Sequence, residues 1–215
     1  MVVEMDEATR AQVAHLFTGL EADVTMHVFV ESRDCLYCND TLALAKLVAG
    51  ISDKVHVQEH RGALGTGIAA ELGVKYAPAI VLHGEKRYKV RFYGIPVGHE
   101  FGALIGTIVD VSTGTPPLPP DVVSDIAAIE SPIHTLVFTT PQCPYCPNMV
   151  RLSHQSAIIN PLIESDMIES LEFQHLTMHY GVFGVPKTVI NDQVEIEGLV
   201  PPEVFVEKLY QAVER

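Results

Sequence analysis

The sequence predicts an α/β protein built from two tandem halves, in each of which a central mixed sheet is flanked by helices. Three observations carry this prediction. Strand-like and helix-like segments alternate in the same order twice, four landmarks recur at a nearly constant offset, and a proline-rich segment separates the two copies. Alternating strands and helices are typical of a parallel layer, and two adjacent strands add a hairpin at its edge.

The first half contains each of these elements in order. A strand is indicated where β-branched and aromatic residues cluster, and a helix where apolar residues run on over several turns. The turn residues His83 and Gly84 separate two short apolar strands. We expect helices at 4–18, 35–49, 64–72 and 100–109, and strands at 25–31, 54–58, 79–82 and 89–93.

The second half repeats this order. After a short opening helix come a strand, a long helix, a further strand and a short helix, followed by a hairpin and a closing helix. We expect helices at 121–129, 143–159, 174–179 and 203–213, and strands at 135–139, 168–173, 188–190 and 194–197.

The landmarks identify the two halves as a duplication. Cys143 lies 108 residues after Cys35, and Pro186 lies 108 residues after Pro78. The strand residues 28–30 map onto 136–138, and Gly94 maps onto Gly198 after a four-residue deletion. Self-similarity at a fixed offset indicates an internal repeat.

A proline-rich segment, 113–120, separates the copies. Such segments favour an extended, semi-rigid geometry. We therefore expect one domain over residues 1–116 and a second over 117–215, held at a set distance.

The chemistry-bearing residues are two Cys-x-x-Cys pairs, Cys35 with Cys38 and Cys143 with Cys146. Each pair follows a strand and opens a helix, where partial positive charge and free N–H groups stabilise a thiolate. We expect Cys35 and Cys143 to be nucleophiles near the N-cap. Cys38 and Cys146, one turn deeper, would resolve the mixed disulfide. Three residues apart at a helix start, the sulfurs of each pair can meet.

These landmarks resemble the thioredoxin superfamily, and the whole chain resembles the two-domain, glutaredoxin-like protein disulfide oxidoreductases. The resemblance implies two thioredoxin-like domains that form, reduce or isomerise protein disulfides in the cytosol, with electrons from a thioredoxin-reductase-type flavoprotein. It also implies that the Ala77–Pro78 and Val185–Pro186 bonds are cis and lie beside the nucleophiles. These four residues would form the substrate-binding loops, in which a cis Pro78 or Pro186 leaves the backbone groups of Ala77 or Val185 free to pair with an extended peptide.

The sequence departs from this family at two places. Thioredoxins carry a buried Asp on the strand, six residues before the nucleophile, where this chain has Phe29 and Val137. Glu31 and Thr139 lie nearby, and the proton acceptor of the resolving cysteine stays unassigned. The glycine pair with which glutaredoxins bind glutathione is reduced here to Gly198 followed by Leu199.

Charge and hydropathy bound the function further. The formal net charge is −13, so neither nucleic acid nor an anionic membrane is an expected partner. No apolar run approaches the roughly 18 residues of a spanning helix, and residues 1–7 do not look like a signal peptide. The expected compartment is the cytoplasm, where close cysteine pairs are typically catalytic, redox-sensing or metal-binding.

Rival interpretations remain. A zinc ion shared by both cysteine pairs would have to join Cys38 and Cys143, which are 105 positions apart, far more than in usual zinc ribbons. His175 and His179 could ligate a metal from one helix face or form a solvated face. We expect no metal and no cofactor. A dedicated electron-transfer module feeding a peroxidase and a non-catalytic peptide-binding module are the alternative functions.

We also expect the second site to do more of the disulfide chemistry. Pro144 replaces Leu36, and at the first helical position it would hold Cys143 rigidly at the positive end of the helix dipole. The opposite charges of Arg33 and Asp34, just before Cys35, would largely cancel. Pro147, by contrast, is expected to remove an early helical hydrogen bond.

Overall fold

The computed structural model describes residues 4–31, 35–62 and 64–214. The first half of the chain holds α1 (Glu7–Phe17), β1 (Val24–Val30), α2 (Cys38–Ala49), β2 (Val55–Arg61), α3 (Gly67–Glu71), β3 (Ala79–His83), β4 (Arg87–Tyr93) and α4 (Glu100–Thr113). The second half holds α5 (Pro120–Ala127), β5 (Ile133–Thr139), α6 (Cys146–Ile159), β6 (Ile163–Glu169), α7 (Gln174–His179), β7 (Lys187–Ile190), β8 (Val194–Glu197) and α8 (Pro202–Val213). The predicted order is therefore present twice.

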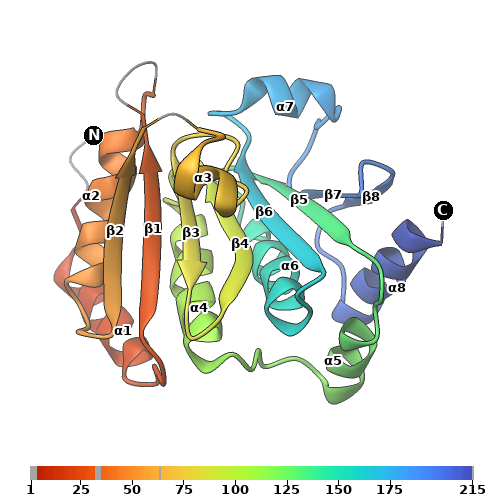
Figure 1. The fold of residues 1–215 in the computed structure, drawn as a ribbon, viewed down its shortest axis with the longest axis horizontal. Helices are drawn as coiled ribbons and strands as arrows, with labels where there is room; N and C mark the ends of the chain where they lie inside the picture. The colour runs from red at the N-terminus through yellow and green to blue at the C-terminus, as the bar shows by residue number, and fades with distance from the viewer. Residues whose placement is uncertain (1–3, 32–34, 63, 215) are drawn as a thin grey trace.

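The strands form one eight-stranded mixed sheet in the order β2-β1-β3-β4-β6-β5-β7-β8. Each half contributes four neighbouring strands, with β1 and β5 parallel to β2 and β6 and antiparallel to β3 and β7. The predicted α/β fold of two tandem units is confirmed. Beyond that prediction, β4 pairs in parallel with β6, so the two sheets continue into each other (Figure 1).

Helices cover both faces of this sheet unequally. The larger apolar core lies on the face covered by α2, α4, α6 and α8 and runs without a break through both halves. A smaller core on the other face lies beneath the short helices α3 and α7. In Figure 1, α4 and α6 lie behind the middle of the sheet, where Arg151 of α6 forms a salt bridge of 2.7 Å with Asp110 of α4. The halves therefore meet through helices as well as strands.

A buried ion-pair network joins the central strands. Arg91 on β4 is 2% exposed, and its Nε lies 2.5 Å from Asp166 on β6. The same guanidinium reaches Glu164 at 2.8 Å, and His134 on β5 contacts Asp166 at 2.7 Å. A buried charge is costly unless it is paired, so this network fixes the position of β4 against β6.

The strand predicted at 168–173 is wrong, because β6 spans Ile163–Glu169. Its central residues include Glu164 and Asp166, which interrupt the apolar pattern of a buried strand. These acids are tolerated inside the sheet because Arg91 pairs with both. The partner comes from the other half, so the local sequence pattern gave no sign of it.

The proline-rich segment contributes less to the arrangement than the sequence suggests. Helix α4 ends at Gly114, which has a φ of +64°, and α5 begins at Pro120. A residue with positive φ is a common helix stop. The relative position of the halves is set by the β4–β6 pairing and the α4–α6 contact. Among the described residues, no helix is long and apolar enough to cross a bilayer.

Candidate active sites

The four cysteines form two disulfides, Cys35–Cys38 and Cys143–Cys146, with a Cα–Cα distance of 5.5 Å in each. This pairing confirms the expected connectivity. Each disulfide lies between the end of a strand, β1 or β5, and the start of the following helix, α2 or α6. The duplication therefore preserves the site as well as the fold.

The helices begin later than expected. Cys38 and Cys146 are the first helical residues, and Tyr37 and Tyr145 are the N-caps. The prediction that Pro144 occupies the first helical position is therefore wrong, because Pro144 precedes the N-cap. Pro147 occupies the second helical position, where the backbone N–H has no partner within a helix, so it removes no helical hydrogen bond.

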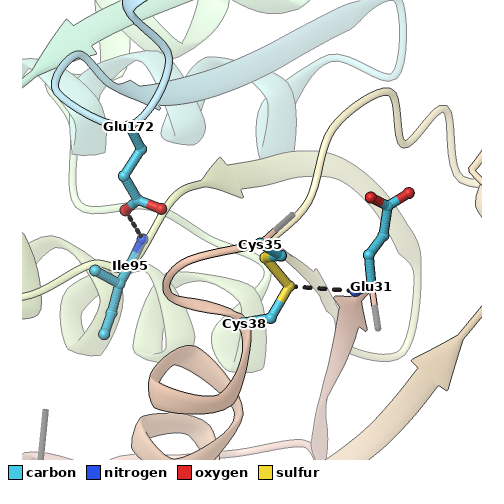
Figure 2. Close-up of a disulfide and its surroundings, with 5 residues drawn as sticks. All are labelled: Glu31, Cys35, Cys38, Ile95 and Glu172. Atoms are coloured by element: carbon cyan, nitrogen blue, oxygen red, sulfur yellow. Dashed lines mark hydrogen bonds between the residues drawn. A yellow bond between two sulfur atoms is a disulfide. The ribbon is translucent and has the colours of Figure 1, made fainter. Parts of the chain in front are cut away.

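Backbone N–H groups contact one sulfur in each site. At the second site, the N–H of Cys146 donates to Cys143 Sγ at 3.2 Å, so the start of α6 provides a hydrogen-bond donor to the outer cysteine. At the first site, the N–H of Glu31 donates to Cys38 Sγ at 3.2 Å (Figure 2). The expected charge cancellation by Arg33 and Asp34 lies outside the described residues.

Exposure distinguishes the cysteines within each pair. Cys38 is 2% exposed and Cys146 is 0% exposed. Cys143 retains 7%, and Cys35 is only partly buried. The outer cysteine of each pair is therefore the more exposed of the two, as expected for a nucleophile.

The Ala77–Pro78 and Val185–Pro186 bonds are both cis. In each half the N–H of a glycine donates to the carbonyl of this proline, from Gly94 to Pro78 at 3.0 Å and from Gly198 to Pro186 at 2.8 Å. The landmarks found in the sequence thus form one repeated local structure.

The first of these proline loops lines a cavity together with its cysteine. A cavity of about 470 Å³ beside the first disulfide is lined by Cys35, Ala77 and Pro78. Val185 packs instead against the smaller apolar core of the second half. The cavity also has a wall from the second half, so the first site is built by both copies. Its other lining residues are Leu36, Tyr37, Ile95, Val97, Pro141, Gln142, Glu169, Leu171, Glu172 and Phe173.

Carboxyl groups gather at this wall. Glu172 Oε1 accepts a hydrogen bond of 2.6 Å from the N–H of Ile95, and burial raises the pKa of Glu172 to about 7 (Figure 2). Burial also raises the pKa of Glu169, which has one buried oxygen without a partner. Glu100, at the start of α4, has no hydrogen-bond partner for either oxygen, and burial raises its pKa to about 8.

Sequence reasoning missed these acids. Glu169 is the last residue of β6 and Glu172 follows the strand, far along the chain from Cys35, and neither matches a repeated landmark. The parallel pairing of β4 with β6 brings them to the first site.

The two histidines of α7 point to different neighbours, since His175 contacts the Tyr76 ring and His179 the Tyr180 ring.

Comparison with known proteins agrees with this geometry. The model of a thioredoxin domain family matches residues 133–211. The NADH dehydrogenase of Bacillus subtilis is 25% identical over 205 residues, which are 95% of this chain and 38% of that protein. One of the subunits of the alkyl hydroperoxide reductase of Staphylococcus epidermidis is 29% identical over 120 residues, 56% of this chain and 23% of that protein. The chain thus spans well under half the length of these curated relatives.

Two solved structures share the fold over nearly the whole chain. A protein disulfide oxidoreductase from Aeropyrum pernix has a TM-score of 0.90 at 27% identity, covering 99% of this chain and 95% of that one. The N-terminal domain of the alkyl hydroperoxide reductase from Enterococcus faecalis has a TM-score of 0.90 at 23% identity, covering 96% and 100%. The joined eight-stranded architecture therefore occurs in other proteins.

Proposed function

Because this chain belongs to the thioredoxin superfamily, we propose that it is a thiol–disulfide oxidoreductase that acts on protein disulfides through two Cys-x-x-Cys sites. The observation that carries the proposal is the presence of two disulfides, each with its outer cysteine less buried than its inner one. A purely structural pair would gain little, since so short a loop constrains little chain entropy. The similarity to the Aeropyrum pernix oxidoreductase supports the same chemistry.

In the reductive direction, the thiolate of Cys35 or Cys143 attacks one sulfur of a substrate disulfide. The substrate S–S bond breaks, a mixed disulfide forms, and the leaving sulfur takes up a proton. Cys38 or Cys146 then loses its proton and attacks the outer cysteine, which releases the second substrate sulfur. Two electrons pass from the protein dithiol to the substrate, and the reverse sequence oxidises a substrate dithiol.

We further propose that the cis-proline loops bind the substrate. The backbone groups of Ala77, next to Pro78, would pair with an extended peptide at the first site, and those of Val185, next to Pro186, at the second. The cavity shared by Cys35, Ala77 and Pro78 supports this role in the first half. Exposed Leu36 and Tyr145, 82% and 62% exposed, offer apolar contacts to a protein substrate within each Cys-x-x-Cys motif.

The proposed electron donor is a flavoprotein of the thioredoxin-reductase type, and the proposed compartment is the cytoplasm. We divide the activity between residues 1–116 and 117–215, one site in each. The segment 114–119, which contains neither helix nor strand, supports this boundary.

Insulin reduction by dithiothreitol tests the proposal. The wild-type chain should accelerate precipitation of the insulin B chain roughly tenfold or more over dithiothreitol alone. A variant with all four cysteines replaced by serine should not accelerate it, and its far-ultraviolet circular dichroism serves as the folding control. Equal precipitation with both proteins would show that the chain is no oxidoreductase and would favour a peptide-binding module.

A second candidate function is electron transfer from a flavoprotein to a peroxidase. The similarity to the alkyl hydroperoxide reductases favours it, since the matched region is only a part of those longer proteins. Oxidation of NADH by a thioredoxin-reductase-type flavoprotein with hydroperoxide and a peroxiredoxin separates the two. A dedicated module would support this chain of transfers and leave insulin almost unreduced.

A further inference from the structure

The first disulfide lies beside an acidic wall that belongs to the other half of the chain. Cys35 and Glu172 line the same cavity, although 137 positions separate them in the sequence. Among the described residues that line this cavity, none of those from the first half is acidic. Phe29 occupies a buried strand position, and the exposed side chain of Glu31 points away from the disulfide (Figure 2).

The acid is held in place by close packing. Glu172 Oε1 accepts the N–H of Ile95, immediately after Gly94. A Cβ at Gly94 would lie 2.5 Å from Glu169 Cβ and 2.8 Å from Glu172 Oε1, so this glycine lets the acidic turn approach. At the equivalent Gly198 a Cβ would meet nothing within 4 Å. The acidic wall is therefore a feature of the first site that the duplication did not copy.

We propose that Glu172 carries the proton for thiol–disulfide exchange at Cys35, so that the second half completes the first redox site. This inference rests on the proposed function. Glu172 accepts the proton of the Cys35 thiol as that sulfur attacks the substrate disulfide. It then passes the proton to the substrate sulfur that leaves, so the step needs no further proton donor.

The surroundings of Glu172 suit this exchange. The titratable groups that line the cavity with it are Cys35, Tyr37 and Glu169, and the described lining residues include no lysine, arginine or histidine. Burial, with repulsion from Glu169, raises the pKa of Glu172 to about 7. Glu100 repels Glu169 in turn from the start of α4. A carboxyl group that ionises near neutral pH can both accept and return a proton.

The test isolates the first site in a parent variant, Cys143→Ser with Cys146→Ser. Into this parent we introduce Glu172→Gln, which keeps an oxygen to accept the Ile95 N–H but cannot carry a proton. Glu207→Gln, an exposed change on α8, is the matched control. Two readouts are followed from pH 5.5 to 9: alkylation of reduced Cys35 by iodoacetamide, measured by mass spectrometry, and the rate of insulin reduction.

The two readouts should move in opposite directions. In the parent and the control, coupling to Glu172 should spread the alkylation profile over two ionisation steps. Glu172→Gln should leave one step and faster alkylation near pH 7, because a negative charge in the cavity that Cys35 lines is gone. Insulin reduction should nevertheless fall roughly tenfold to a hundredfold. Far-ultraviolet circular dichroism and urea unfolding of each variant test whether the fold is retained.

Two results would overturn the proposal: an alkylation profile in Glu172→Gln that matches the parent, or unchanged insulin reduction. If the parent itself does not reduce insulin, the proposed function fails at the first site. The alkylation profile still shows whether the ionisation of Cys35 depends on Glu172. The failure of the proposed function and the failure of this inference are therefore distinguishable.

Discussion

Gly94 and Gly198 occupy equivalent positions in the two halves but meet different surroundings. Both have positive φ, +94° and +80°, and both donate to the carbonyl of a cis proline. The sequence offset predicted their equivalence. It did not predict that Gly94 alone is covered by Glu169 and Glu172, because that contact depends on how the halves join.

Alanine substitution should separate conformational strain from close packing. Gly198→Ala forces positive φ on a residue with a Cβ and should lower the free energy of unfolding by about 1–2 kcal/mol. Gly94→Ala adds a clash with the acidic turn and should cost about 2–4 kcal/mol. Urea unfolding of both variants measures the difference. Equal losses would mean that the acidic turn moves aside freely.

At the scale of elements, the sequence predicted the helices that follow the cysteines better than it predicted where they begin. The apolar runs of α2 and α6 were sufficient to place them, but their first turns depend on the disulfide loops. Because α6 begins at Cys146 and not at Cys143, Pro147 lies in its first turn and Pro144 lies before it. The missed start of β6 has a different origin, since buried Asp166 and half-buried Glu164 are paired by Arg91 from the other half.

The site ranking expected from the sequence remains a prediction, on altered grounds. The start of α6 directs the N–H of Cys146 at Cys143 Sγ, whereas Cys35 faces a cavity lined by carboxyl groups. A thiolate should therefore form more readily at Cys143. Cys143→Ser should lose more insulin-reducing activity than Cys35→Ser under identical conditions. A Cys35→Ser variant that loses as much or more would contradict this ranking.

At the scale of the whole molecule, the two copies form one structural body. The duplication was readable from the sequence because landmarks recur at one spacing. The joined sheet was not, since pairing of β4 with β6 rests on Arg91 and Asp166, which lie in different copies and belong to no repeated motif. The same pairing places Glu169 and Glu172 beside the first site. The contact between the halves therefore contributes both to the stability of the fold and to the first candidate site.

Titration of the buried groups should give this molecule its greatest stability near pH 6.5–7. Burial lowers the pKa of His27 and His83 to about 4 and of His154 to about 3, so the folded state keeps them neutral. Below their ordinary value of 6.5, the unfolded chain binds more protons at these sites, and stability rises with pH. Glu100 acts in the opposite sense, because burial raises its pKa from 4.5 to about 8.

Above pH 7 the histidines no longer change the stability with pH, and the buried glutamates determine how the free energy of unfolding varies. The folded protein holds the Glu100 proton that the unfolded chain has already lost, so stability should fall by about 1 kcal/mol per pH unit up to pH 8. Glu172, with a pKa of about 7, adds to the lower part of this decline. Urea unfolding of wild type and Glu100→Gln at pH 7, 8 and 9 measures the effect. The substitution should remove most of the slope between pH 7 and 8, and an unchanged slope would mean that Glu100 ionises in the folded protein as it does in water.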